Sequence, residues 1–136
     1  MGSKVVGMVV QSGAANRICC VVVYAAAALA SGRKVVLHLV NEGLVAFRKD
    51  VAGKVWSSER PDDWSIFPEQ YRGYVEVFLK NVNGAIKSGS FKNWHEMLAE
   101  LKKEYGDNLK IYACPLAAQM YNINKKEDLL DIVDAI

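Results

Sequence analysis

Cys114 stands between two segments of different character. The preceding run 109–113 is short and apolar, which predicts a buried strand. Pro115 follows directly, and because proline is favoured at the first helical position, a helix is expected over 115–120. The thiol would then lie at a helix N-terminus, where free backbone N–H groups and the macrodipole stabilise the nucleophilic thiolate. A buried structural cysteine that ends a strand gives the same pattern, so both interpretations stay open.

Polar side chains follow two further predicted strands, 5–10 and 34–40. In an open α/β sheet, ligands bind at the carboxyl ends of the strands, so these side chains are expected to converge around Cys114. If the strand 5–10 is central, its loop lies between the other two. The same residue types are also common in turns and caps, which is the alternative for each of them. The candidate substrate-binding residues are Gln11, Ser12, Asn16, Asn41 and Glu42.

Other catalytic and metal-binding patterns are missing from the sequence. The loop after the first strand has neither the glycine spacing of a dinucleotide site nor a P-loop lysine, and no serine-hydrolase elbow occurs. His38 and His95 are far apart and no Cys-x-x-Cys accompanies them, so we expect no metal site and no cofactor. His38 is expected to be a core or interface histidine. Cys19 and Cys20 fall within an apolar helix and are expected to be small buried hydrophobes.

The length and composition of the chain indicate a single globular domain over 1–136. Net charge is +2 with no basic cluster, which argues against nucleic acid as a partner. Three cysteines, two of them adjacent, make no disulfide framework and favour a reducing, cytoplasmic location. The apolar run 18–30 is shorter than the ~20 residues that cross a bilayer, so no membrane association is expected.

Hydrophobic periodicity predicts alternating strands and helices. The run 5–10 is apolar on both faces and predicts a central strand; the helix 17–30 is apolar almost all round and is expected to be buried, with Gly32 as its cap. With the strand 34–40 these form a right-handed βαβ unit. A short helix is expected over 44–48, after a turn at 41–43.

The second half of the chain is predicted to be mainly helical. An irregular segment 50–63 precedes a helix that opens at Pro68, and a further helix is capped by Asn93 and ended by Gly106. A helix is expected over 125–131 and a strand from 133. The aromatic residues in and after the irregular segment indicate either an interface or lid, or a local hydrophobic cluster: Trp56, Trp64, Phe67, Tyr71 and Tyr74. The architecture is a three-layer α/β domain with a mostly parallel sheet.

Several passages in this order resemble the DsrE/DsrF-like family. The resemblance covers most of the chain outside an insertion at about 50–90. The similar passages are the strand 5–10 with its small-residue helix, Ala28-Leu29-Ala30-Ser31-Gly32-Arg33-Lys34-Val35, Asn41-Glu42-Gly43-Leu44-Val45, Tyr112-Ala113-Cys114-Pro115, and the closing segment 124–136. Where relatives usually carry glycine after the cysteine helix, this chain has Asn122, which can also adopt the left-handed conformation.

This resemblance implies a flavodoxin-like fold, assembly into trimers or hexamers, and sulfur handling. Cys114 would accept a sulfane sulfur as persulfide or thiosulfonate and pass it to a partner such as a small TusA-like carrier. A non-catalytic oligomeric subunit that binds a small ligand or serves assembly is the alternative. A thiol redox sensor is a third possibility, although no resolving cysteine lies near Cys114 in the sequence.

Overall fold

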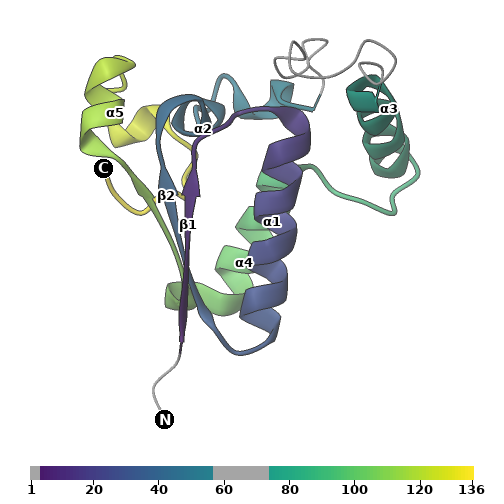
Figure 1. Cartoon of the computed structure of the whole chain (residues 1–136), viewed down its shortest axis with the longest axis horizontal. Coiled ribbons are helices and arrows are strands. Elements are labelled where there is room, and N and C mark those ends of the chain that lie inside the picture. The colour runs from purple at the N-terminus through teal and green to yellow at the C-terminus, as the bar shows by residue number, and fades with distance from the viewer. Residues whose placement is uncertain (1–3, 57–73) are drawn as a thin grey trace.

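A computed structural model describes residues 4–56 and 74–136 of the chain (Figure 1). The strands are β1 (Val5–Val10), β2 (Lys34–Leu39) and β3 (Leu109–Ala113). The helices are α1 (Ala15–Ala30), α2 (Asn41–Ala46), α3 (Tyr74–Lys87), α4 (Trp94–Tyr105) and α5 (Pro115–Met120). Single 3₁₀ turns are η1 (Ala52–Lys54), η3 (Gly106–Asn108) and η4 (Lys126–Asp128). The α/β class and the βαβ unit are confirmed. No helix among the described residues is long and apolar enough to cross a membrane.

The sheet is parallel throughout, in the order β1-β2-β3. This arrangement is consistent with the expected flavodoxin-like class, but the central position predicted for β1 is wrong, because β2 occupies the centre. Val5 and Val9 of β1 are exposed on one face, while Val10 is buried. The β-branched run therefore formed a strand as predicted, but its apolar residues did not indicate whether the strand is central or at an edge of the sheet.

The two faces of the sheet differ in how they are covered. Leu37 of β2 and Ile111 of β3 are fully buried on the face that α1 and α4 cover (Figure 1). On the other face, the aligned residues Val9, His38 and Tyr112 form a row across the three strands, and none of them is fully buried. α5 lies on this second side, at the carboxyl end of the sheet.

α1 packs through one stripe rather than all round, which corrects the expectation of a fully buried helix. The stripe recurs at helical spacing and consists of Ala15, Ile18, Val22, Ala25 and Leu29. Val23 and Tyr24 point to solvent on the opposite side. Gly32 ends the helix with φ of +85°, as the sequence predicts.

The segment after β2 and the C-terminal segment differ from the expected helices. α2 begins at Asn41, within the predicted turn, and ends at Ala46. The helix expected over 125–131 is wrong, since only η4 forms. Instead, Lys49 N–H donates to the Asp128 carbonyl and Leu130 N–H to the Phe47 carbonyl, at 2.9 and 2.8 Å. These bonds satisfy the backbone in an antiparallel bridge between Arg48 and Leu129 and leave it unavailable for a helix.

Trp56 belongs to the hydrophobic core. Its ring is buried, its Nε1–H donates to the Ala15 carbonyl at 3.0 Å, and it stacks on Phe91 at 5.8 Å. For Trp56 the local-cluster interpretation is therefore confirmed. Trp64, Phe67 and Tyr71, and the expected helix start at Pro68, lie outside the described residues, as does the side chain of Tyr74.

α4 has the predicted ends. Asn93 is its N-cap, and its Oδ1 accepts from the Trp94 N–H at 2.9 Å. Gly106 ends the helix with φ of +55°. The strand expected from 133 does not form in the described chain, which has there a single isolated parallel bridge between Tyr112 and Ala135.

Candidate functional site

Cys114 is held by its backbone at the carboxyl end of β3. Its N–H donates to the Leu39 carbonyl of β2, and its own carbonyl accepts from the Ala118 N–H of α5, both at 2.9 Å. Cys114 is the N-cap of α5 and Pro115 its first residue, so the predicted strand–cysteine–proline–helix order is confirmed. The side chain is partly buried, with its inner side packed against the core. The backbone of Cys114 is thus fixed on both sides, and the residue is only partly buried.

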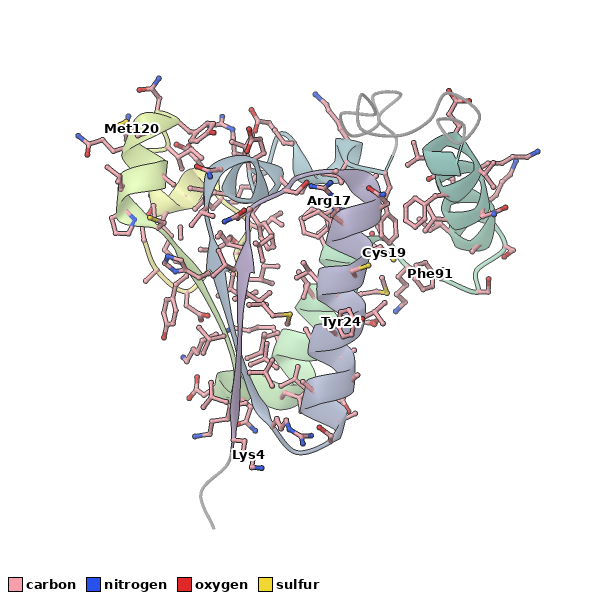
Figure 2. The ribbon with its side chains drawn as sticks, viewed as in Figure 1. Lys4, Arg17, Cys19, Tyr24, Phe91 and Met120 are labelled. Atoms are coloured by element: carbon pink, nitrogen blue, oxygen red, sulfur yellow. The ribbon has the colours of Figure 1, made fainter. Side chains whose placement is uncertain are left out.

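α5 is short and is stopped by Asn122. That residue has φ of +57°, the left-handed conformation for which glycine is the usual choice. The Ile123 N–H then donates to the Ala118 carbonyl at 2.8 Å, and the Ile123 side chain is buried. The outer side of α5 is apolar and open, since Leu116 and Met120 are both exposed; Figure 2 shows Met120 at the outer end of the helix.

The loops around Cys114 follow the strand order, and one expectation about them is wrong. Because β2 is central, the loop that starts α2 lies between the β1 loop and Cys114. Asn41 and Glu42 are exposed at the start of α2, which follows β2, the strand next to that of Cys114. Gln11, Ser12 and Asn16 follow β1, one strand farther away. Only the first two candidates are therefore neighbours of the cysteine strand.

Two glycines allow the β1 loop to pack against α2. The Gly43 N–H donates to the Gln11 carbonyl at 3.0 Å, and a Cβ on Gly43 would lie 2.1 Å from the Val10 carbonyl oxygen. A Cβ on Gly13 would lie 2.6 Å from the Glu42 carbonyl oxygen. Neither glycine was predicted to have this role, although their place after successive strands was a usable signal.

A comparison with known families decides the classification of this fold. The sequence model of the DsrE/DsrF-like family matches residues 4–135, nearly the whole chain. The chain belongs to this family. No curated protein sequence matches it significantly.

The β1-loop residues of this DsrE/DsrF-like protein have different local roles. Ser12 Oγ accepts from the Ala14 N–H at 3.1 Å, which is the turn role considered for it. Asn16 Oδ1 is buried and is the one buried side-chain nitrogen or oxygen within residues 4–56 and 74–136 that has no hydrogen-bond partner. A buried acceptor without a donor is unfavourable, so Asn16 is the loop residue with an unused hydrogen-bonding capacity.

The other two thiols of this DsrE/DsrF-like protein lie on α1. Cys19 is partly buried, and burial, with a smaller contribution from Cys20, raises the pKa of its thiol. Figure 2 shows Cys19 on the side of α1 that faces α3. Cys20 is exposed, so the expectation that both cysteines are buried is wrong for Cys20. All three cysteines are free thiols.

Proposed function

We propose that this protein is a cytoplasmic sulfur carrier in which Cys114 is the sulfur-accepting nucleophile. The observation that carries the proposal is the placement of Cys114. Its backbone is bonded on both sides, its thiol is partly exposed, and it ends a strand at the ligand-binding edge of a DsrE/DsrF-like sheet. Of the three thiols, Cys114 alone combines a fixed backbone at that edge with partial exposure.

The transfer balances without an external oxidant. The Cys114 thiolate attacks the terminal sulfane sulfur of a persulfide or polysulfide, the donor's S–S bond breaks, and the donor leaves as a thiolate with the electron pair. Cys114 then holds one additional sulfur as a persulfide. With tetrathionate, the same attack on an inner sulfur releases thiosulfate and leaves a Cys114 thiosulfonate.

Delivery reverses the attack on a second protein. The thiolate of an acceptor, such as a TusA-like carrier, attacks the outer sulfur, and Cys114 leaves as a thiolate. In this proposal Asn41 and Glu42, which begin α2 after the neighbouring strand β2, contact the donor or the acceptor. This chemistry needs neither metal nor organic cofactor, and the proposed assembly is a trimer or hexamer.

Intact-mass measurement after polysulfide treatment tests the proposal. The wild type should gain the mass of sulfur that dithiothreitol removes, and Cys114→Ser should gain none. Cys20→Ser is the matched control, because Cys20 is the most exposed of the three thiols, and it should gain sulfur like the wild type. Uptake by Cys114→Ser, or loss of uptake in Cys20→Ser alone, would move the chemistry to α1 and contradict the proposal.

The pH dependence of alkylation separates the thiols further. Because the pKa of Cys19 is raised, its thiolate fraction at any pH below that pKa is smaller than that of an ordinary thiol. At pH 6, brief iodoacetamide treatment should therefore label Cys114 ahead of Cys19, and Cys19 should react only as the solution becomes alkaline. Peptide mapping measures both. Dominant labelling of Cys19 at pH 6 would contradict the site assignment.

A non-catalytic assembly subunit is the second candidate, favoured by the exposed apolar residues of β1 and α5. Under that function the wild type would form its oligomer and gain no sulfur from any donor. The same mass experiment, combined with the oligomeric state, distinguishes the two functions.

A further inference from the structure

The outer face of α5 carries a pair of large apolar side chains after Cys114. Leu116 and Met120 are about one helical turn apart, so they lie on the same face of α5, and they are 63% and 65% exposed. Ala117 and Ala118, on the inner face, are buried. Figure 1 shows α5 at the carboxyl end of the sheet with no described element beyond its outer side. An uncovered apolar pair therefore follows the proposed sulfur carrier directly in the chain.

The shape of this surface fits a protein rather than a small molecule. Sites for small molecules are concave and enclose most of the ligand. Leu116 and Met120 instead project from the outer face of a helix and keep most of their surface in water, so a small sulfur donor would leave them largely uncovered. A protein surface laid across α5 would cover both side chains, and methionine is enriched in such interfaces.

The charges around Cys114 define the chemistry of that protein. No charged residue occurs from Ile111 to Asn124, although 24% of the chain is charged. The exposed Glu42 stands at the start of α2, which packs against α5. An acidic group beside the cysteine of a partner would be repelled by the Glu42 carboxylate, whereas a basic group would be attracted to it.

We propose that Leu116 and Met120 are the docking surface for the protein that exchanges sulfur with Cys114, and that this partner carries an apolar and a basic side chain beside its own cysteine. The apolar side chain packs on Leu116 and Met120, and the basic one faces Glu42. The Cα–Cβ bonds of a helix tilt toward its N-terminus, so a partner docked on α5 is directed toward the end at which Cys114 lies. The inference rests on the sulfur-carrier proposal and adds the chemistry of the partner to it.

Cysteine peptides activated as 2-thiopyridyl disulfides test this surface. One peptide carries leucine and lysine beside its cysteine, a second has serine in place of the leucine, and a third has glutamate in place of the lysine. The Cys114 thiolate attacks the peptide sulfur, the S–S bond breaks, and pyridine-2-thiolate leaves with the electron pair. Peptide mapping gives the ratio of label at Cys114 to label at the exposed Cys20, which cancels differences in the intrinsic reactivity of the peptides.

The peptide with leucine and lysine should give the highest ratio of label. Partial burial of one leucine side chain predicts a ratio about tenfold above that of the serine peptide. The double variant L116S/M120S should lower this ratio to that of the serine peptide, and E42Q should remove the preference for lysine over glutamate. V77S is the matched control, because Val77 is 51% exposed on α3, and it should keep the wild-type ratio.

Three results would overturn the docking surface. These are equal ratios for the leucine and serine peptides, an unchanged ratio in L116S/M120S, and dissociation of L116S/M120S in light scattering, which would show that α5 packs between copies of this chain. Polysulfide uptake by L116S/M120S should equal that of the wild type. Lost peptide preference with intact uptake contradicts the docking surface alone, whereas failure of the wild type to take up sulfur contradicts the sulfur-carrier proposal.

Discussion

The two edges of the sheet differ in whether the outward-pointing backbone groups have hydrogen-bond partners. At the β3 edge, Asp134 Oδ2 accepts from the Ile111 N–H at 2.7 Å and from Lys102 Nζ at 2.6 Å. The Asp134 N–H in turn donates to the Ile111 carbonyl, and the Ala113 N–H donates to the Ala135 carbonyl, at 2.7 and 2.9 Å. A carboxylate and a short stretch of backbone thus take the place of a neighbouring strand. At the β1 edge, the corresponding groups have no partner within the described chain.

This difference bears on how firmly the strand that carries Cys114 is held. β3 carries Cys114 at its end, and it is held between β2 on one side and the terminal segment on the other. A thiol that must meet its donor in one geometry benefits from such a fixed strand. β1 carries no candidate catalytic side chain within its own length, and its Val5 and Val9 are exposed.

Removal of the Asp134 carboxylate should change the free energy of unfolding more than the other substitutions at the two edges. Asp134→Ala leaves the Ile111 N–H without its acceptor and the Lys102 ammonium with the Leu109 carbonyl but no carboxylate. Both side chains of the ion pair are only about one-fifth exposed, at 21% and 22%. We expect the free energy of unfolding to fall by about 2 kcal/mol, because a partly buried donor and a partly buried charge lose their partner. Urea denaturation measures the change.

Asp131→Ala is the matched control. Asp131 is paired with Lys49 at 3.4 Å and its side chain is 96% exposed, so its loss should change stability by less than about 0.5 kcal/mol. Equal effects of the two substitutions would show that the β3 edge is not closed by Asp134, and the contrast between the edges would fail.

Local sequence signals predicted much of the fold. β-branched runs located β1 and β2, and a short apolar run located β3. Gly32 and Gly106 marked helix ends because both adopt positive φ. The order of the strands was not predictable in this way. The side on which a strand packs depends on contacts between distant segments, and an edge strand such as β1 has the same residue types as a buried one.

In the candidate site too, features that depend on local sequence were predictable and features that depend on distant segments were not. The order of β3, Cys114 and Pro115 is a local signal and was confirmed. The grouping of Gln11, Ser12 and Asn16 around Cys114 stays a prediction, and the strand order shows only that the loop after β2 lies between theirs and Cys114. The helix expected over 125–131 failed because the backbone there bonds to residues 47–49, which lie almost 80 residues earlier in the chain. Long-range pairing of this kind leaves no periodicity in the sequence.

Substitution of Gly7 should change the free energy of unfolding less than Asp134→Ala does, and in the opposite direction. Gly7 is not in a positive-φ conformation, and a Cβ there would contact nothing within 4 Å. Gly7→Ala should raise the free energy of unfolding by about 0.5–1 kcal/mol, because alanine loses less conformational entropy in a strand than glycine does. Denaturation by urea measures the gain. A destabilised Gly7→Ala would show that another segment packs against the face of β1 at Gly7, which would contradict the open surroundings of this strand.

The smallest expected effect concerns an exposed ion pair at the start of β3. Lys110 Nζ donates to Asp107 Oδ1 at 2.9 Å, and this hydrogen bond, with the charge of Lys110, lowers the pKa of the Asp107 carboxyl. Lys110→Met should therefore raise the pKa of Asp107 toward its ordinary value, which NMR titration of the carboxyl carbon would detect.

Because the folded-state pKa of Asp107 is depressed, any stability from the ion pair is present above the ordinary pKa of an aspartate and is lost as the pH falls through the lowered pKa. Both groups titrate in contact with water, so the urea midpoint at neutral pH should stay at the wild-type value. A large loss of stability in Lys110→Met would mean that surface charge, rather than the partly buried Asp134, closes the β3 edge.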